Sequence, residues 1–246
     1  TNRHEVVSYL IKKQPVLTAI QTNIKCIGDI ERLISKVATG KVSPREVVQL
    51  KNSLEAILPI KKESENAKNN AIKTIGKNLQ DCKILREKIT NTLNEDAPVL
   101  IQKGNAIAKG VSEELDELRS IAKGGKDYLN EMLERETERT GINSLKIASN
   151  NVFGYYIEVR NTHKDKVPEE WIRKQTLVNA ERYITEELKE YEAKILGAEE
   201  KIAFLESEVF GKLIEWMLQF IDQVQQNAQL IGKLECLCSF ASLAIE

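Results

Sequence analysis

The chain has 246 residues, of which 41% are hydrophobic, 30% are charged and 5% are aromatic, and its formal net charge is −1. This length allows one or two domains with a buried core, and the few aromatic residues favour a helix-rich chain over a β-sandwich. Because the charges balance, nucleic-acid binding would need a local group of cations. The four scattered cysteines are typical of free thiols in a reducing compartment.

No apolar run is long enough to span a bilayer. The chain opens with Thr1 inside a helical pattern, so we expect it to be a piece of a longer protein.

The first part of the chain, up to about residue 62, has the pattern of several helices. Pro15 is typical of a first helical turn. Ser43-Pro44 followed by Glu46 predicts a capping box, and an apolar face recurs at helical spacing from Val47 to Leu58. No internal repeat is visible, which disfavours a solenoid. Residues 63–109 are more polar and indicate only short helices.

A long helix is predicted from Ser112 to a stop at Thr140-Gly141. Small and apolar residues step by three and four from Leu115 to Glu136, which predicts a seam for a partner helix. Roughly 29 residues at ~1.5 Å each give a length of about 40 Å. The Gly124-Gly125 pair weakens this helix by about 2 kcal/mol relative to alanines and allows a neighbour to approach closely.

A second long helix is predicted after Thr185, with a matching stripe from Leu188 to Phe220. Two stripes separated by a short insert bury each other only if the helices run antiparallel. We therefore predict a two-helix arm with the insert at its far end. Residues 221–246 are helical and increasingly apolar, and we expect them to return to the base of the arm.

The insert itself has the pattern of strands. Residues 145–149 alternate in polarity, residues 150–154 contain turn formers and a glycine, and residues 154–159 are rich in aromatic and β-branched types. Residues 171–177 and 182–185 form a second such pair. The predicted fold class is mainly α with a small inserted antiparallel β-sheet, made of two successive hairpins at the tip of a long antiparallel helix pair.

Polar side chains gather near the two predicted turns, 150–154 and 177–181. If direction alternates from strand to strand, both turns point away from the arm and the connection 160–171 faces it. The residues concerned are Lys146, Ser149, Asn150, Asn151, Lys174, Thr176, Asn179 and Arg182. Short hydrogen-bonding groups with a few cations suit sequence-neutral phosphate binding. The alternative, more common for such residues, is that Asn and Gly simply form good turns.

The runs NNVFGYYIEV and RKQTLVNAERYITEELKEYE resemble the clamp domain of the MutS family of bacterial DNA mismatch-recognition proteins. The helical flanks, including GVSEELDELRSIAKGGKDYLNEMLERETERTGI and the closing ECLCSFASLA, resemble the lever (core) domain of that family. The resemblance covers essentially the whole chain. It implies a first lever part at 1–141, a clamp at 142–187 and a returning lever part at 188–246.

The resemblance also implies a function. In this family the clamp tips grip the backbone of double-stranded DNA without reading bases, which would make the eight polar residues above DNA-backbone contacts. The lever couples this grip to an ATPase domain that lies outside this chain. A homodimer around a mismatched duplex, a MutL-like partner and a bacterial cytoplasmic, nucleoid-associated location follow from the family. Many relatives have a lysine where this chain has Val178, so one cationic contact is expected to be missing.

No catalytic or metal site is predicted in this fragment, and we expect it not to be an enzyme. The chain lacks a G-x-x-x-x-G-K-[ST] motif, so ATP and Mg belong to the full-length family protein and no cofactor is expected here. Cys236 and Cys238 lie on different sides of a helix and have no second ligand pair. Neither His4 nor His163 has an evident catalytic partner. The alternative function is a coiled-coil-like scaffold arm whose β tip binds a protein partner.

Overall fold

The structure is a computed structural model that describes residues 2–245. It contains two compact units. The first unit comprises the residues up to Val111 and those from Glu206 onward, and the second comprises Ser112–Leu205. Helix α8 (Glu186–Met217) contributes its first part to the second unit and its last part to the first.

The first unit is helical. Its elements are α1 (Asn2–Lys12), α2 (Gln14–Ile24), α3 (Ile30–Ala38), α4 (Pro44–Asn66), α5 (Asn70–Asn78), α6 (Lys83–Thr92), the 3₁₀ turn η1 (Ile101–Lys103), the end of α8, the 3₁₀ turn η3 (Leu218–Phe220) and α9 (Ile221–Leu243). The predicted capping box is confirmed, because Ser43 accepts from the backbone of Glu46 and the Glu46 carboxylate accepts from the backbone of Ser43. Helix α9 packs against α1, α2 and α3.

Two buried polar side chains attach the loops of this unit to its helices. The Asn227 side chain on α9 accepts from the backbone N–H of Gln80 at 2.8 Å and donates to the carbonyl of Gln80 at 2.9 Å. The Glu206 carboxylate on α8 accepts from the backbone N–H groups of Asn105 at 3.0 Å and Ala106 at 3.1 Å. Both side chains are fully buried, so these hydrogen bonds satisfy groups that water does not reach.

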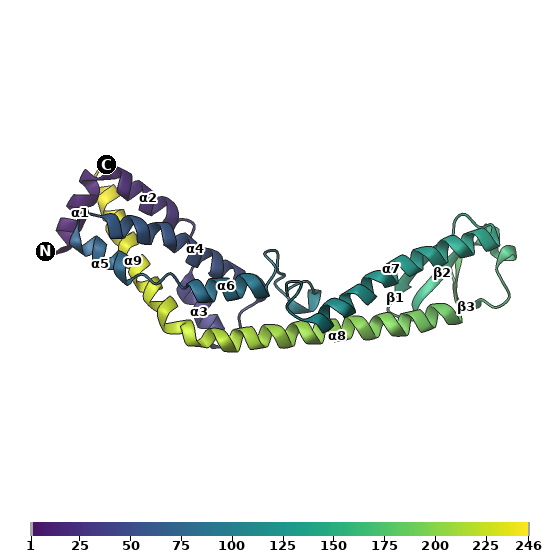
Figure 1. Cartoon of the computed structure of the whole chain (residues 1–246). Coiled ribbons are helices and arrows are strands. Elements are labelled where there is room, and N and C mark those ends of the chain that lie inside the picture. Colours follow the sequence, from purple (N-terminus) through teal and green to yellow (C-terminus); the bar gives the residue numbers. More distant parts are fainter. Residues whose placement is uncertain (1, 246) are drawn as a thin grey trace. The chain divides into compact units, whose positions relative to one another are not determined.

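The second unit contains a helix pair and a sheet (Figure 1). Its elements are α7 (Glu113–Thr140), β1 (Lys146–Asn150), β2 (Gly154–Arg160), the 3₁₀ segment η2 (Asn161–Lys166), β3 (Ile172–Thr176), β4 (Ala180–Ile184) and the first part of α8. The predicted helix starts are confirmed: Ser112 Oγ accepts from Leu115 N and Thr185 Oγ1 from Leu188 N. Gly141, with φ +66°, ends α7 in the left-handed conformation.

Helices α7 and α8 run antiparallel within this unit, as predicted. The ring of Tyr128 on α7 stacks on that of Tyr191 on α8 at 5.2 Å between centroids. One face of the sheet packs against the helix pair in a single apolar cluster, which consists of Met132, Ile142, Leu145, Ile157, Val159, Trp171, Tyr183 and Leu188. The mainly α fold with a small inserted antiparallel sheet is therefore confirmed.

The strand order corrects one expectation. The sheet has the order β1-β2-β4-β3, so β2 pairs with β4 and β3 lies at an edge. The two hairpins exist as predicted, but β3 runs in the same direction as β2, and the connection 161–171 returns along the length of the sheet. The turns 150–154 and 177–179 consequently lie at opposite ends of the sheet, and the expectation that both point the same way was wrong.

Candidate nucleic-acid interface

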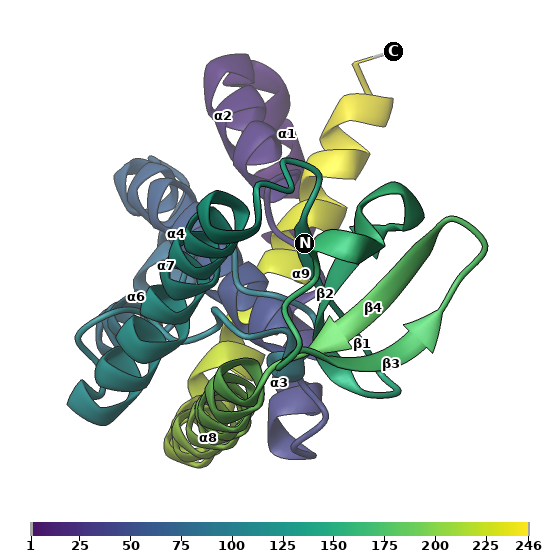
Figure 2. The same ribbon diagram turned by 90° about the vertical axis from the view of Figure 1, so that its right-hand side faces the viewer.

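The sheet has one end at which β2 finishes, β4 starts and β1 begins, which we call the distal end. In the strand register, Arg160 lies opposite Ala180 there, and Lys146 lies opposite Glu158. The backbone N–H of Asn161 donates to the carbonyl of Asn179 at 3.1 Å, which ties the start of η2 to the β3–β4 turn. In Figure 2 the β3–β4 hairpin ends in a turn that points away from α7 and α8.

A groove of 550 Å³ opens at the distal end. Its lining consists of Ser144, Lys146, Glu158, Arg160, Asn161, Thr162, Asn179 and Ala180. Lys146 and Arg160 are exposed and make no ion pair with the residues that the structure describes. Ser144 Oγ is buried and has no hydrogen-bond partner among those residues. The groove therefore presents two unpaired cations together with neutral donors, which suits an anion.

The other predicted turn lies at the opposite, proximal end of the sheet and docks on helix α8. The backbone N–H of Tyr155 donates to the Glu192 carboxylate at 3.2 Å. Asn150 uses its side-chain oxygen inside the turn, where it accepts from Val152 N at 3.0 Å and Phe153 N at 3.1 Å. The predicted site residues Ser149, Asn150 and Asn151 are thus separated from the distal groove by the length of β2, which is about 20 Å at ~3.3 Å per residue.

Arg182 lies in the central strand β4, where its guanidinium already has partners. Its Nε donates to Glu158 Oε2 at 3.0 Å and its Nη1 donates to Gln175 Oε1 at 2.9 Å. The same group lies over the ring of Tyr156, 4.4 Å from the centroid. These contacts link β2, β3 and β4, so Arg182 has a clear role in holding the strands together.

Lys174 and Thr176 are on the edge strand β3, where every residue is exposed. The register shifts between Arg173 and Gln175, which makes Lys174 the extra residue of a bulge. A bulge and a lysine are common ways to protect an edge strand from pairing with other chains, so Lys174 has a structural explanation beside the predicted phosphate contact. Thr176 is closer to the distal end, opposite Glu181.

A buried carboxylate fixes β4 from the face that packs on the helices. Glu181 accepts from the Tyr183 hydroxyl and pairs with Arg173 at 3.3 Å. The hydrogen bond from Tyr183 and the charge of Arg173 hold the pKa of Glu181 below its ordinary value, against the opposite effect of burial. Burial and the bond to Glu181 raise the pKa of Tyr183 to about 12. At neutral pH the carboxylate is therefore charged and the phenol is not, as a stable structural pair requires.

Sequence reasoning identified two of the eight residues of the distal groove, Lys146 and Asn179, and missed the other six, among them Arg160, Asn161 and Thr162. These three were assigned to a connection facing the arm, because strand direction was assumed to alternate along the chain. One signal could have indicated otherwise: Arg173-Lys174-Gln175-Thr176 contains no apolar residue, which is typical of an edge strand. With β3 at an edge, β4 must pair with β2, and that pairing brings Arg160 beside Ala180.

No group of three or more His, Cys, Asp and Glu side chains among residues 2–245 could hold a metal ion. None of the helices in the same range is long and apolar enough to cross a membrane.

The sequence of the chain is similar to those of known proteins. Residues 110–201 match MutS family domain IV. The chain is 68% identical over 98% of its length to the DNA mismatch repair protein MutS of Christiangramia forsetii, and 65% identical over 99% to that of Flavobacterium johnsoniae. The protein of the same name from Bacteroides fragilis is 56% identical over the whole chain. The chain spans 28% of the length of each of these relatives.

Proposed function

The chain belongs to the MutS family of DNA mismatch repair proteins, and from this we propose that it forms the lever and clamp of such a protein. Residues 142–187 are the clamp and grip the backbone of duplex DNA without reading its sequence. Residues 1–141 and 188–246 are the lever, which couples DNA binding to an ATPase domain outside this chain.

The distal groove is the observation that supports this proposal best. Its two exposed cations, Lys146 and Arg160, face open solvent beside the amide side chains of Asn161 and Asn179. Phosphate oxygens accept hydrogen bonds from both kinds of group, and such contacts position a protein on DNA without specifying sequence. The net charge of −1 for the chain means that this local arrangement has to supply the attraction.

The proposal predicts salt-dependent binding to duplex DNA of random sequence. Dissociation constants of roughly 10⁻⁴ to 10⁻⁶ M are usual for non-specific contacts. Lys146→Ala and Arg160→Ala should each reduce the slope of log affinity against log salt by about 1. Asn179→Ala should weaken binding by about 1 kcal/mol and leave that slope nearly unchanged, because it removes a neutral donor. Fluorescence anisotropy with a short labelled duplex at several salt concentrations measures both quantities.

Two further variants sharpen this test. Lys83→Ala removes an exposed cation in the first unit and should leave both affinity and slope unchanged. Val178→Lys adds a cation at the distal turn, where the valine side chain is 90% exposed, and should increase the slope by about 1. The proposal would be contradicted if Lys83→Ala lost as much DNA affinity as the groove variants. It would also be contradicted if the affinities for matched and random duplexes differed greatly.

Apart from the groove, the proposed DNA-backbone contacts are Lys174 and Thr176 on β3 and, at the proximal end, Ser149, Asn150 and Asn151. The variant Lys174→Ala in the same titration distinguishes two roles of this lysine, contact with a DNA phosphate and protection of the edge strand from pairing with other chains. Loss of one unit of salt slope indicates a phosphate contact, whereas an unchanged slope with aggregation at high concentration indicates protection of the edge.

The rest of the proposal concerns the whole protein. We propose a homodimer around mismatched duplex DNA, a MutL-like partner, and a cytoplasmic, nucleoid-associated location, in keeping with the bacterial relatives. The exposed Val178 favours one second candidate, a scaffold arm whose tip binds a protein. An affinity for duplex DNA that does not depend on salt concentration would favour that candidate over the clamp.

A further inference from the structure

Two adjacent glycines in the interior of α7 have different surroundings. A Cβ atom at Gly125 would collide with the Ile195 side chain and the Tyr191 hydroxyl of α8, so the close approach of the two helices requires this glycine. A Cβ atom at Gly124 would have no neighbour within 4 Å. Packing therefore explains Gly125 and leaves Gly124 unexplained, although glycine destabilises a helix interior relative to alanine.

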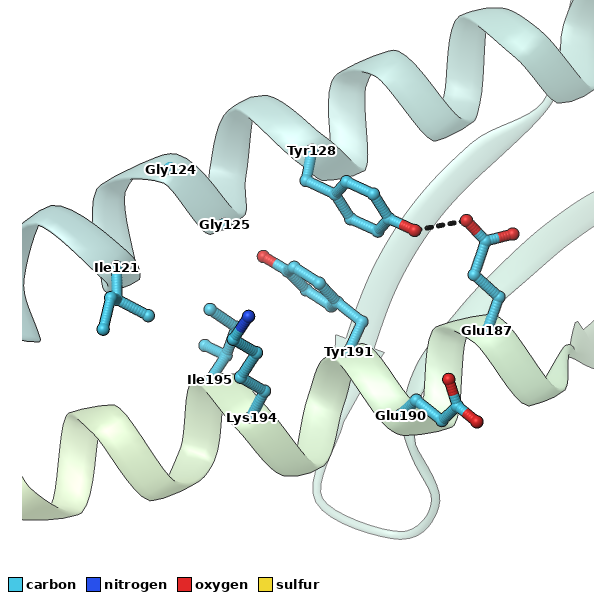
Figure 3. Close-up of a pocket in the computed structure, with 9 residues that line it drawn as sticks. All are labelled: Ile121, Gly124, Gly125, Tyr128, Glu187, Glu190, Tyr191, Lys194 and Ile195. Atoms are coloured by element: carbon cyan, nitrogen blue, oxygen red, sulfur yellow. Dashed lines mark hydrogen bonds between the residues drawn. The ribbon is translucent and has the colours of Figure 1, made fainter.

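A cavity of 480 Å³ lies beside this pair, between α7 and α8 (Figure 3). Ile121, Gly124 and Gly125 line it from α7, and Tyr191, Lys194 and Ile195 line it from α8. Helix α8 has its own unexplained glycine at this level, because Gly197 also has no atom within 4 Å of a Cβ position. Each helix thus has an interior glycine that packing does not explain, and the glycine of α7 lines the cavity.

The helix pair is firmly connected on the side of the cavity that leads to the sheet. The Tyr128 hydroxyl donates to Glu187 (Figure 3), and Arg135 Nη2 donates to the same carboxylate at 2.7 Å. Beyond these bonds the apolar cluster of Met132 and Leu188 joins both helices to the sheet. A change in shape of the pair is therefore easiest at the cavity and not next to the sheet.

We propose that α7 and α8 bend at the level of Gly124 and Gly197, and that this bend adjusts the position of the sheet relative to the base of the helix pair. Sharp bends in helices commonly occur at glycine pairs, and the cavity gives the side chains of Ile121 and Ile195 room to move without a clash. The adjustment would let a clamp follow a duplex, which is the one part of this inference that rests on the proposed function.

Double electron–electron resonance measures the bend directly. Spin labels at Glu117→Cys and Glu138→Cys flank the glycines on exposed positions of α7, about 32 Å apart for a straight helix at ~1.5 Å per residue. Cys26→Ser and Cys236→Ser remove the exposed native thiols. Cys82 and Cys238 remain unlabelled, because they are buried and burial raises the pKa of each to about 11.

The expected result is a broad distance distribution that becomes narrow in Gly124→Ala. Alanine favours the helical conformation about fivefold over glycine, so the bent population should fall about fivefold. Gly211→Ala is the matched control. Like Gly124, Gly211 is an interior helix glycine whose Cβ position has no neighbour within 4 Å, but it lies elsewhere, in α8. This variant should leave the distance distribution broad. A wild-type distribution as narrow as that of Gly124→Ala would overturn the proposal.

A DNA titration of Gly124→Ala combined with Gly197→Ala tests the functional part. We expect weaker binding of a random duplex by several-fold at low salt, with an unchanged salt slope because no phosphate contact is lost. Unchanged affinity in a chain whose distance distribution has narrowed would show that the bend does not serve the clamp. If the wild-type chain binds no DNA, the proposed function fails, and the resonance measurement still decides whether the helices bend.

Discussion

Gly154 begins β2 with a φ of +73°, in the left-handed region that costs other residues about 1–2 kcal/mol. Its position also lies directly against the Glu192 carboxylate, which accepts from the next backbone N–H, that of Tyr155. The glycine thus serves two purposes, because it forms the turn and lets the proximal end of the sheet approach α8.

We predict that Gly154→Ala lowers the free energy of unfolding of the second unit by about 2–3 kcal/mol, from backbone strain plus the displaced Glu192 hydrogen bond. Gly141→Ala is the control, since its φ of +66° brings the same strain but its Cβ would meet nothing within 4 Å. Urea unfolding followed by the fluorescence of Trp171, in a Trp216→Phe background, reports on this unit. Equal losses in both variants would mean that contact with Glu192 contributes little.

Individual residue roles were predictable where they depend on local chemistry. Ser43, Ser112 and Thr185 cap helices as their sequence contexts indicate, because each hydroxyl needs only a backbone N–H two or three residues ahead. The role of Arg182 was not predictable in this way. Its partners Glu158 and Gln175 are on two other strands, so only the strand order shows that its charge is already paired.

Among the elements, the helices follow from the sequence more closely than the sheet. The apolar spacing of α7 and α8 predicts both their lengths and their antiparallel pairing, because a helix face is set by residues three and four apart. Strand pairing depends on contacts between distant segments, and the polar run of β3, the one local signal of its edge position, was not used in the prediction. Consequently the two hairpins were predicted correctly, while the distal groove and its residue Arg160 were not.

Helix α9 and the loop before α6 are joined by Asn227, which is fully buried. Asn227→Ala would leave the backbone N–H and C=O of the half-buried Gln80 without these two partners. We predict a loss of about 2–4 kcal/mol in the free energy of unfolding of the first unit, at about 1–3 kcal/mol for each unsatisfied group. Urea unfolding followed by Trp216 fluorescence, in a Trp171→Phe background, measures it.

The neighbouring Gln226 is the control for this prediction. Its side chain donates to the carbonyl of Asn78 at 3.3 Å from an exposed position, so Gln226→Ala should change stability by less than about 0.5 kcal/mol. A loss in Asn227→Ala no larger than that would show that water replaces the two hydrogen bonds.

At the scale of the whole molecule, the chain spans 28% of the length of its relatives, and we propose that the ATPase domain lies outside it. Because the chain lacks a phosphate-binding loop, we predict that calorimetric titration with MgATP gives no saturable heat. Tripolyphosphate is the control for weak binding of phosphates in the distal groove. Heat that is equal for the two ligands and disappears with added salt belongs to the groove, whereas saturable binding of ATP alone would contradict the prediction.

The pairing of β2 with β4 also has a kinetic consequence. Helices α7 and α8 can meet only after the segment between them has closed into a loop, at an entropic cost that grows slowly with its length. Each hairpin forms from near neighbours, and joining β2 to β4 then brings the two helix ends together, since β1 follows α7 and β4 precedes α8. The sheet is thus placed to act as the folding nucleus of this unit, with the helix pair closing behind it.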